Sequence, residues 1–407
     1  MSKGPRAVHR RKKLIERDIM MGFEKLEAYL DTLEAAYGIP ACDCSVRHHR
    51  TEVFRHTAGY ADIARSKPVS TNDLYFLYSA TKVITCTAVM QLVERGRLGL
   101  EDAVDRYLPE FAHMQVLLDT PPEYMPIPWG GETAPAKNRI RIVDLMTMTA
   151  GLSYDLQAEP IVRLQKDSGN RATTREMIAA IAQCPLLFEP STRYRYSLAH
   201  DVLAVVVEVV TGVSFSAYLQ QNVFAPLGIH DMHFALTASN RDRLSEQYQV
   251  DPQSKHRTSI GRTNRFVLTE RYESGGAGLI STVDAYAVFV DAMCCGGVGK
   301  NGARILTMES INQMRRNRLE GILLEDFHSR GKNGYGYGLG VRTLIDRSDS
   351  PSPLGEFGWD GAAGAYVLID PEHELGIVYA QHVCGCADAY AFVHPTIRNL
   401  VYEALSL

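Results

Sequence analysis

The chain has 407 residues, of which 45% are hydrophobic and 22% are charged, a composition typical of a soluble globular protein and not of a disordered one. Basic and acidic residues number 43 and 47, for a net charge of −4, which argues against a dedicated nucleic-acid binder. No segment approaches the run of about 18 apolar residues that indicates a membrane span. A chain of this length buries a large core without the help of a metal or disulfides.

The first 18 residues are basic, with seven lysines and arginines. They are not followed by the apolar run and small-residue cleavage site of a secretory signal peptide. We expect residues 1–18 to form a disordered tail, with a tether to nucleic acid or to an anionic membrane as the alternative. The cytoplasm is the expected compartment.

Eight cysteines fit a reducing compartment, where they are expected to be small buried hydrophobic residues. Two pairs have C-x-C spacing, Cys42 with Cys44 and Cys384 with Cys386. If the two segments were adjacent, the four thiols would have the ligand set of a tetrahedral zinc site. The usual spacing of such ligands is wider, so no metal is expected and the zinc site is the alternative.

Helices and strands are indicated by the spacing of apolar residues, taken in chain order. A helix is expected over 19–37, ended by Gly38 and Pro40. A hairpin of strands 44–48 and 53–60 follows, around the turn 49–51. Further helices are expected over 80–96, 142–152, 174–183, 197–211, 282–293 and 389–404, with a proline-rich connection over 121–135.

Strands return near the C-terminus. Alternating glycines over 334–340 predict a strand with one bare face, and strands 364–370 and 375–382 flank a turn. The order predicts an α+β fold, in which helices flank an antiparallel sheet whose strands come from both ends of the chain. We expect a discontinuous sheet domain, 19–83 with 269–407, and an inserted mainly helical domain, 84–268, with ligands in the cleft between them.

The segment Leu77–Lys82 carries the first chemical signal, Ser79 followed three residues later by Lys82. At the start of a helix these two side chains share one face. A nearby lysine whose pKa is lowered by desolvation can activate a serine hydroxyl, and a helix N-terminus stabilises an oxyanion. A plain serine N-cap beside a surface lysine is the alternative.

Two later segments add to this signal. Tyr196 stands just before the helix 197–211, where a tyrosine facing the serine can act as general base and acid. The glycine-rich segment 357–364 enters a strand, and its small residues permit a substrate carbonyl to approach the Ala362 N–H. Aromatic packing and a simple turn are the respective alternatives.

In this order, S-x-x-K at Ser79, the tyrosine motif at Tyr196 and the segment 357–364 resemble the serine β-lactamase and penicillin-binding-protein superfamily. The resemblance covers about residues 22–405 and is nearest to the class C branch and the family VIII carboxylesterases. It implies a β-lactamase/transpeptidase-like fold with the site between its two parts. It also implies an acylated nucleophile, Ser79, a proton-handling pair, Lys82 and Tyr196, and an oxyanion hole from the N–H groups of Ser79 and Ala362.

The sequence departs from the family motifs at two places. Leu198 stands where the Y-x-N motif has an asparagine that holds the substrate amide. Trp359, Asp360 and Gly361 stand where β-lactamases have K-T-G, so an apolar wall and a carboxylate that would repel an anion replace a cation. These four residues are the expected substrate contacts, and His200 is a further candidate, with a hydrogen-bonded structural histidine as the alternative.

We therefore expect a serine carboxylesterase that works through an acyl-enzyme on a small-molecule ester, without a cofactor. The alternatives are a β-lactamase or D-stereospecific peptidase, an acyltransferase that passes the acyl group to an alcohol, and a non-catalytic binding protein on the same fold. The chain has no G-x-S-x-G nucleophile elbow and no phosphate-binding loop motif, so an ordinary α/β-hydrolase and a nucleotide-binding protein are not expected.

Overall fold

A computed structural model describes residues 22–121 and 131–407. Its centre is an antiparallel sheet of eight strands in the order β11-β12-β13-β14-β15-β1-β2-β3. The strands are β1 (Ala41–His48), β2 (Thr51–Asp62), β3 (Lys67–Pro68), β11 (Tyr335–Tyr337), β12 (Arg342–Leu344), β13 (Phe357–Asp360), β14 (Tyr366–Asp370) and β15 (Leu375–Ala380). The expected α+β sheet built from both ends of the chain is confirmed.

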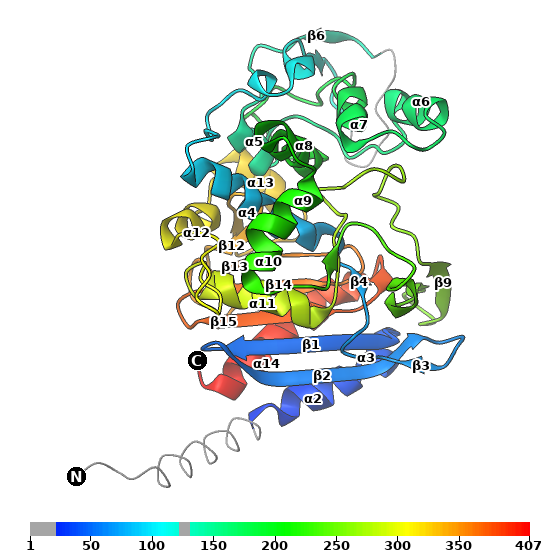
Figure 1. The fold of residues 1–407 in the computed structure, drawn as a ribbon. Coiled ribbons are helices and arrows are strands. Elements are labelled where there is room, and N and C mark those ends of the chain that lie inside the picture. The colour runs from blue at the N-terminus through cyan, green and yellow to red at the C-terminus, as the bar shows by residue number, and fades with distance from the viewer. Residues whose placement is uncertain (1–21, 122–130) are drawn as a thin grey trace, which may run out of the picture.

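Helices cover both faces of this sheet (Figure 1). On one face lie α2 (Glu24–Asp31), α3 (Leu33–Tyr37) and α14 (His394–Leu405), and on the other lies α11 (Val283–Cys294). A mainly helical body rises beyond α11. It contains α4 (Thr81–Glu94), α5 (Ile142–Met146), α6 (Glu159–Asp167), α7 (Thr174–Ile181), α8 (Ala199–Thr211), α9 (Phe215–Leu219), α10 (Ala225–Leu227), α12 (Met308–Arg315) and α13 (Ile322–His328).

Three short sheets and several single turns complete the fold. The first sheet has the order β4 (Tyr75–Phe76), β10 (Ile280–Ser281), β7 (Met232–His233). The second has the order β16 (Val383–Cys384), β8 (Gln247–Val250), β9 (Arg257–Gly261). The third pairs β5 (Gln115–Leu117) with β6 (Thr133–Pro135). The turns are 3₁₀ helices Tyr78–Ala80, Val104–Arg106, Pro109–Phe111 and Arg241–Arg243, and π-helical turns Gln220–Phe224 and Ala389–Val393.

Several predicted elements differ from the structure in extent. The described part of the helix predicted over 19–37 forms two helices separated at Thr32, whose N–H bonds to the Tyr29 carbonyl three residues back. The helix 142–152 ends at Met146, because Met148 takes a left-handed φ of 60°. The strand over 334–340 breaks after Tyr337. The basic tail and part of the proline-rich connection lie outside the described residues.

The β1–β2 hairpin places two kinds of side chain on opposite faces of the sheet. Cys42 and Cys44 join the apolar cluster beneath α2 and α14, where burial raises the pKa of Cys42 to about 12. Asp43 points the other way and pairs with Arg55. Among the described residues no three His, Cys, Asp or Glu side chains are grouped as a metal site. The four-thiol zinc site is therefore not formed.

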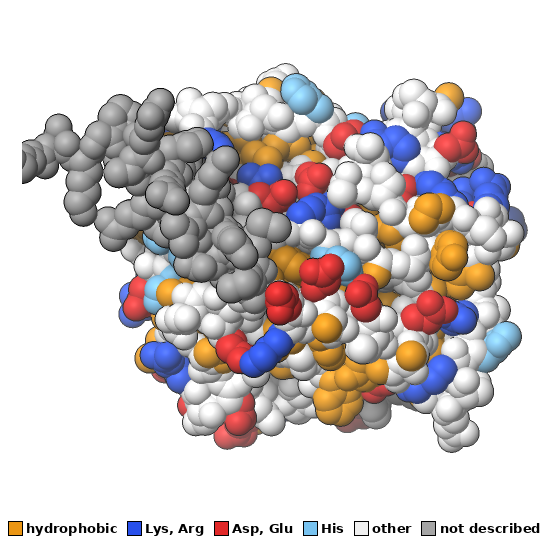
Figure 2. Space-filling model, turned by 90° about the horizontal axis from the view of Figure 1, so that it is seen from below, with side chains coloured by type: hydrophobic (Ala, Val, Ile, Leu, Met, Phe, Trp, Pro, Cys, Tyr) orange, Lys and Arg blue, Asp and Glu red, His pale blue; other side chains and the backbone are white. Residues whose placement is uncertain are grey.

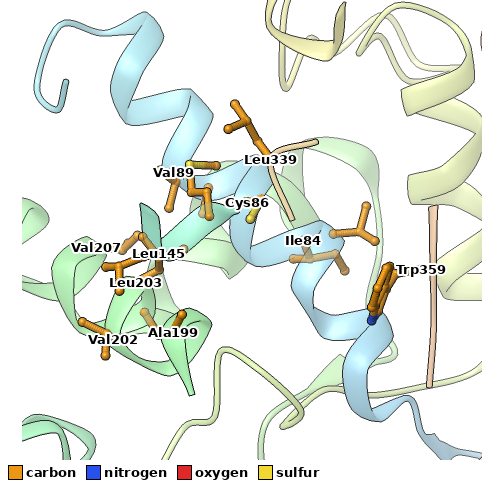
Figure 3. Packing of buried hydrophobic residues seen from close by; sticks show 14 of the residues in the cluster. Ile84, Cys86, Val89, Leu145, Ala199, Val202, Leu203, Val207, Leu339 and Trp359 are labelled. Atoms are coloured by element: carbon orange, nitrogen blue, oxygen red, sulfur yellow. The ribbon is translucent and has the colours of Figure 1, made fainter. Parts of the chain in front are cut away.

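The principal core joins the α11 side of the sheet to the helical body in one cluster. Figure 3 shows Cys86 and Val89 of α4 on the side that faces Leu145 of α5 and the apolar residues of α8, with Ile84 on the other side, nearer Trp359. Each fully buried branched side chain contributes about 2 kcal/mol relative to an exposed one. Because α4 is buried from Thr81 to Leu92, packing fixes its first turn in place.

The predicted division into a sheet domain and an inserted helical domain, with boundaries near residues 83 and 269, stays a prediction. The eight-stranded sheet contains no residue of 84–268. The strand β8 of that segment, however, pairs with β16 from the C-terminal part and with β9 on its other side. The two parts therefore also meet through this small sheet.

The face below the sheet mixes acidic and basic side chains with small apolar groups (Figure 2). Some of the acidic and basic side chains form ion pairs, such as Arg257 with Glu34 and Lys25 with Glu403. Within residues 22–121 and 131–407, no single helix is long and apolar enough to cross a membrane. Among these residues, only α8 and the segment Phe215–Leu227 taken together, with a bend of 74° between them, have the length and composition of a membrane span.

A buried neutral histidine makes the fold sensitive to acid. His382 accepts a hydrogen bond from the Phe76 N–H at 3.0 Å and lies 2.8 Å from the Ser245 carbonyl. Burial lowers the pKa of His382 to about 4. The unfolded chain therefore binds the proton more tightly, so stability is complete above about pH 6.5 and is lost as the pH falls toward 4.

We expect this group to remove about 3 kcal/mol of unfolding free energy across that interval. Urea unfolding at pH 7.5, 5.5 and 4.5 measures it, with His382→Gln as the comparison because glutamine keeps a donor and an acceptor but does not titrate. The variant should lose less stability than the wild type on acidification. Equal pH dependence of the two proteins would contradict the assignment.

Candidate active site

Ser79 lies in the 3₁₀ turn that leads into α4, and this turn contacts β13 of the sheet. The preceding residue, Tyr78, has a φ of 46°, which is rare for a residue with a side chain. Tyr78 is held there by its hydroxyl bond to Gln247 and by edge contact with the Phe266 ring. Strained backbone of this kind concentrates at functional sites, because the surrounding structure must maintain it.

Lys82 lies one turn beyond Ser79 and is fully buried. Its Nζ donates to Ser79 Oγ at 3.2 Å and to the Gly276 carbonyl at 2.7 Å. Burial lowers the pKa of Lys82 to about 7, although the charge of Asp201 acts in the opposite direction. A large fraction of the amine is therefore neutral near pH 7 and able to accept a proton.

Tyr196 lies in the segment that leads into α8. Its hydroxyl is hydrogen-bonded to Ser79 and accepts the indole N–H of Trp359 at 3.0 Å. Burial raises the pKa of Tyr196, so the phenol carries its proton at neutral pH. Because the indole donates to the phenol oxygen, the phenol proton is free to point toward Ser79. Lys82 Nζ lies 4.5 Å from the centre of the Tyr196 ring.

The turn after β13 lies against the backbone that carries Ser79. A Cβ on Gly361 would come within 2.3 Å of the Leu77 carbonyl oxygen, so only glycine permits this contact. The turn is closed by hydrogen bonds from Gly361 N to Ala365 O and from Gly364 N to Gly361 O, at 2.8 and 2.9 Å. Ala362 sits within it, two residues beyond the end of β13. The oxyanion hole expected from the Ser79 and Ala362 N–H groups stays a prediction, and its two residues lie on backbone segments that touch at Gly361 and Leu77.

Asp360 behaves differently from the prediction. Its carboxylate accepts hydrogen bonds from Lys332 and from Arg342, and these two cations hold its pKa well below the usual range. Asp360 is thus ionised, but its charge is balanced by two cations. The expectation that it repels an anionic substrate is corrected, because the fold brings Lys332 and Arg342, 28 and 18 residues earlier in the chain, to its carboxylate.

Two other predicted substrate contacts are buried in the core. Leu198 is 3% exposed and belongs to the principal apolar cluster. His200 is fully buried, and its Nε2 lies 3.6 Å from Cys86 Sγ. Burial lowers the pKa of His200 far below its usual value. His200 is therefore a structural histidine packed in the core, and Gly361 serves the close backbone contact described above. Of the predicted substrate contacts, Trp359 lies beside the reacting groups.

The prediction missed Tyr154 and Arg330. The Tyr154 ring stacks on Tyr196 with 5.6 Å between centres and 2° between planes, and Trp359 stacks on the same tyrosine at 5.7 Å. Arg330 places its guanidinium carbon 5.3 Å from the Tyr196 ring centre. Three stacked rings therefore form one wall of the site. Neither residue belongs to a motif, and only the folded chain brings them to Tyr196.

The sheet with strands from both ends of the chain, its helical cover and the buried helix that carries Ser79 define a β-lactamase/transpeptidase-like fold. The Beta-lactamase family matches residues 26–383. The chain belongs to the β-lactamase family, which confirms the resemblance drawn from its motifs.

Among its relatives, Protein Rv1367c of Mycobacterium tuberculosis is 32% identical, over 84% of this chain and 86% of its own length. Esterase EstB of Burkholderia gladioli is 28% identical, over 87% of this chain and 88% of its own. The solved structure of EstCE1, a hydrolase with promiscuous acyltransferase activity, superposes with a TM-score of 0.75 at 25% identity. It covers 96% of this chain and 100% of its own.

Proposed function

We propose that the chain is a serine hydrolase that cleaves carboxylic esters through an acyl-enzyme on Ser79. The observation that carries the proposal is the convergence of Lys82 and Tyr196 on one serine hydroxyl. An otherwise weak nucleophile is activated when a neighbouring group takes its proton. The neutral amine of Lys82 is the acceptor favoured by its lowered pKa, either directly or through the Tyr196 phenol.

The reaction then runs in two balanced steps. Ser79 Oγ attacks the ester carbonyl while its proton passes to the Lys82–Tyr196 pair, and the oxyanion forms between the Ser79 and Ala362 N–H groups. The pair returns the proton to the departing alcohol as the ester C–O bond breaks, which leaves an acyl-serine. Water attacks this ester next and gives one proton to the same pair. The pair passes that proton to Ser79 Oγ as the acyl C–O bond to the serine breaks, which releases the acid and free Ser79.

An ester with an apolar part is favoured over a β-lactam. Leucine at 198 cannot hold a substrate amide, and Trp359, 7% exposed, offers a ring where β-lactamases have a lysine. The stack of Tyr154, Tyr196 and Trp359 adds a second apolar surface. The similarity to Esterase EstB, which is named as an esterase, supports the cleavage of esters.

The experiment compares turnover of p-nitrophenyl butyrate and of a chromogenic cephalosporin by the pure protein. We expect kcat/KM for the ester to exceed that for the cephalosporin by at least about 10³-fold, a difference of some 4 kcal/mol in transition-state stabilisation. Faster cephalosporin hydrolysis would instead identify a β-lactamase or D-stereospecific peptidase. A lack of any Ser79 adduct with a fluorophosphonate probe would identify a non-catalytic binding protein.

Acyl transfer is a second candidate, favoured by the likeness to EstCE1. In that reaction an alcohol replaces water in the second step and gives its proton to the same pair. Adding a primary alcohol to the ester assay distinguishes the two, since a transferase forms the new ester in preference to the free acid.

A further inference from the structure

A buried carboxylate stands behind Lys82. Asp201, on the first turn of α8, is 1% exposed. Its Oδ1 accepts the Ser274 hydroxyl at 2.6 Å and the Gly276 N–H at 3.4 Å. Lys82 donates to the carbonyl of the same glycine at 2.7 Å. One residue, Gly276, therefore connects the acid and the amine through its two backbone groups.

The missing side chain of Gly276 lets the two charges approach each other. A Cβ at this position would lie 2.5 Å from Asp201 Oδ2 and 3.5 Å from Lys82 Nζ. The carboxylate and the amine thus border the same small space. The Tyr272 hydroxyl also stabilises the charged form of the fully buried Asp201 carboxylate, and a buried carboxylate in this position needs a nearby cation as well.

The surroundings of Lys82 make Asp201 its electrostatic partner. Of the charged groups whose fields act on this amine in the described part of the chain, Asp201 is the anion that favours the ammonium form and Arg330 the cation that opposes it. The other titratable groups facing it are the Tyr154 and Tyr196 phenols, the Cys86 thiol and the His200 imidazole, and burial keeps all four neutral at pH 7.

We propose that Asp201 is a positioning residue that holds Lys82 through Gly276 and sets the pH at which the amine is free to take the Ser79 proton. The inference rests on the proposed function and deepens it, since it names what tunes the proton acceptor. Asp201 does not touch the substrate. The acid and the amine titrate as a coupled pair, so a change in one moves the apparent pKa of the other.

The test is the pH profile of kcat/KM for p-nitrophenyl butyrate. In the wild type we expect the rate to rise with pH along a limb near pH 7, as Lys82 loses its proton. Asp201→Asn keeps the volume and removes the charge, so the amine becomes neutral at lower pH. The midpoint of this limb should therefore shift to lower pH by about one unit.

A matched control separates charge from packing. Thr85 donates to the Gly275 carbonyl at 2.6 Å and so holds the same loop without a charge. Thr85→Ala should lower the rate without moving the limb. If Asp201→Asn also lowers the rate and leaves the limb in place, Asp201 is only structural and the inference is overturned.

A second variant covers the case in which Asp201→Asn does not fold. Ser274→Ala removes the donor that stabilises the Asp201 carboxylate, so it should move the limb in the same direction by a smaller amount. An unmoved limb in this variant would equally overturn the inference. Failure of the proposed function would appear elsewhere, as wild-type turnover that survives Ser79→Ala.

Discussion

Replacing Ser79 with alanine should lower kcat/KM for p-nitrophenyl butyrate by at least about 10⁴-fold, because the acyl-enzyme then has no oxygen to form on. The substitution removes one half-buried hydroxyl that caps no helix. Lys82 retains its bond to the Gly276 carbonyl, so the buried amine keeps a partner. Steady-state kinetics and a thermal melt measure the two effects, and the melting temperature should stay within about 2 °C of the wild type.

Ser239→Ala provides the control, since Ser239 is exposed in the helical part and outside the site. It should retain wild-type turnover. A Ser79→Ala enzyme with more than one-tenth of wild-type kcat/KM would mean that the ester is cleaved elsewhere.

Replacing Tyr196 with phenylalanine should lower kcat by about 10²–10³-fold while leaving KM nearly unchanged. Phenylalanine keeps the stack with Tyr154 and Trp359, so the wall of the site is preserved. It removes the hydroxyl bonded to Ser79 and the acceptor of the Trp359 N–H. The lost indole bond should reduce stability by about 1 kcal/mol, which urea unfolding measures.

Tyr154→Phe is the matched control for this variant. Tyr154 has the same side chain and belongs to the same stack of rings, but no hydrogen bond to Ser79 is found for it. We expect less than about a tenfold change in kcat. Equal losses in the two variants would show that the phenol of Tyr196 has no special part in proton transfer.

The parts of the site that follow from the sequence are those set by local geometry. Ser79 and Lys82 meet because residues three apart at a helix start share a face, although the helix begins two residues after the serine. Tyr196 was found from its motif, since no spacing relates residue 196 to residue 79. The order of apolar segments was enough to predict the sheet, but it did not predict which residues of neighbouring strands pair.

The parts that did not follow depend on contacts between distant segments. The two cations that neutralise Asp360 come from positions 332 and 342, and only the pairing of β12 with β13 brings Arg342 to it. His200 shares a helical turn with Asp201, yet packing turns its ring toward Cys86. A sequence pattern gives the face of a helix, but the neighbouring layers decide which polar groups on that face are paired.

The most direct test of the account is peptide mapping by mass spectrometry after rapid acid quenching of the enzyme with p-nitrophenyl butyrate. We predict one butyryl group, carried by the peptide that contains Ser79, which appears during turnover and disappears when the ester is exhausted. Turnover without any adduct, or an adduct on a peptide that lacks Ser79, would contradict the proposed acyl-enzyme.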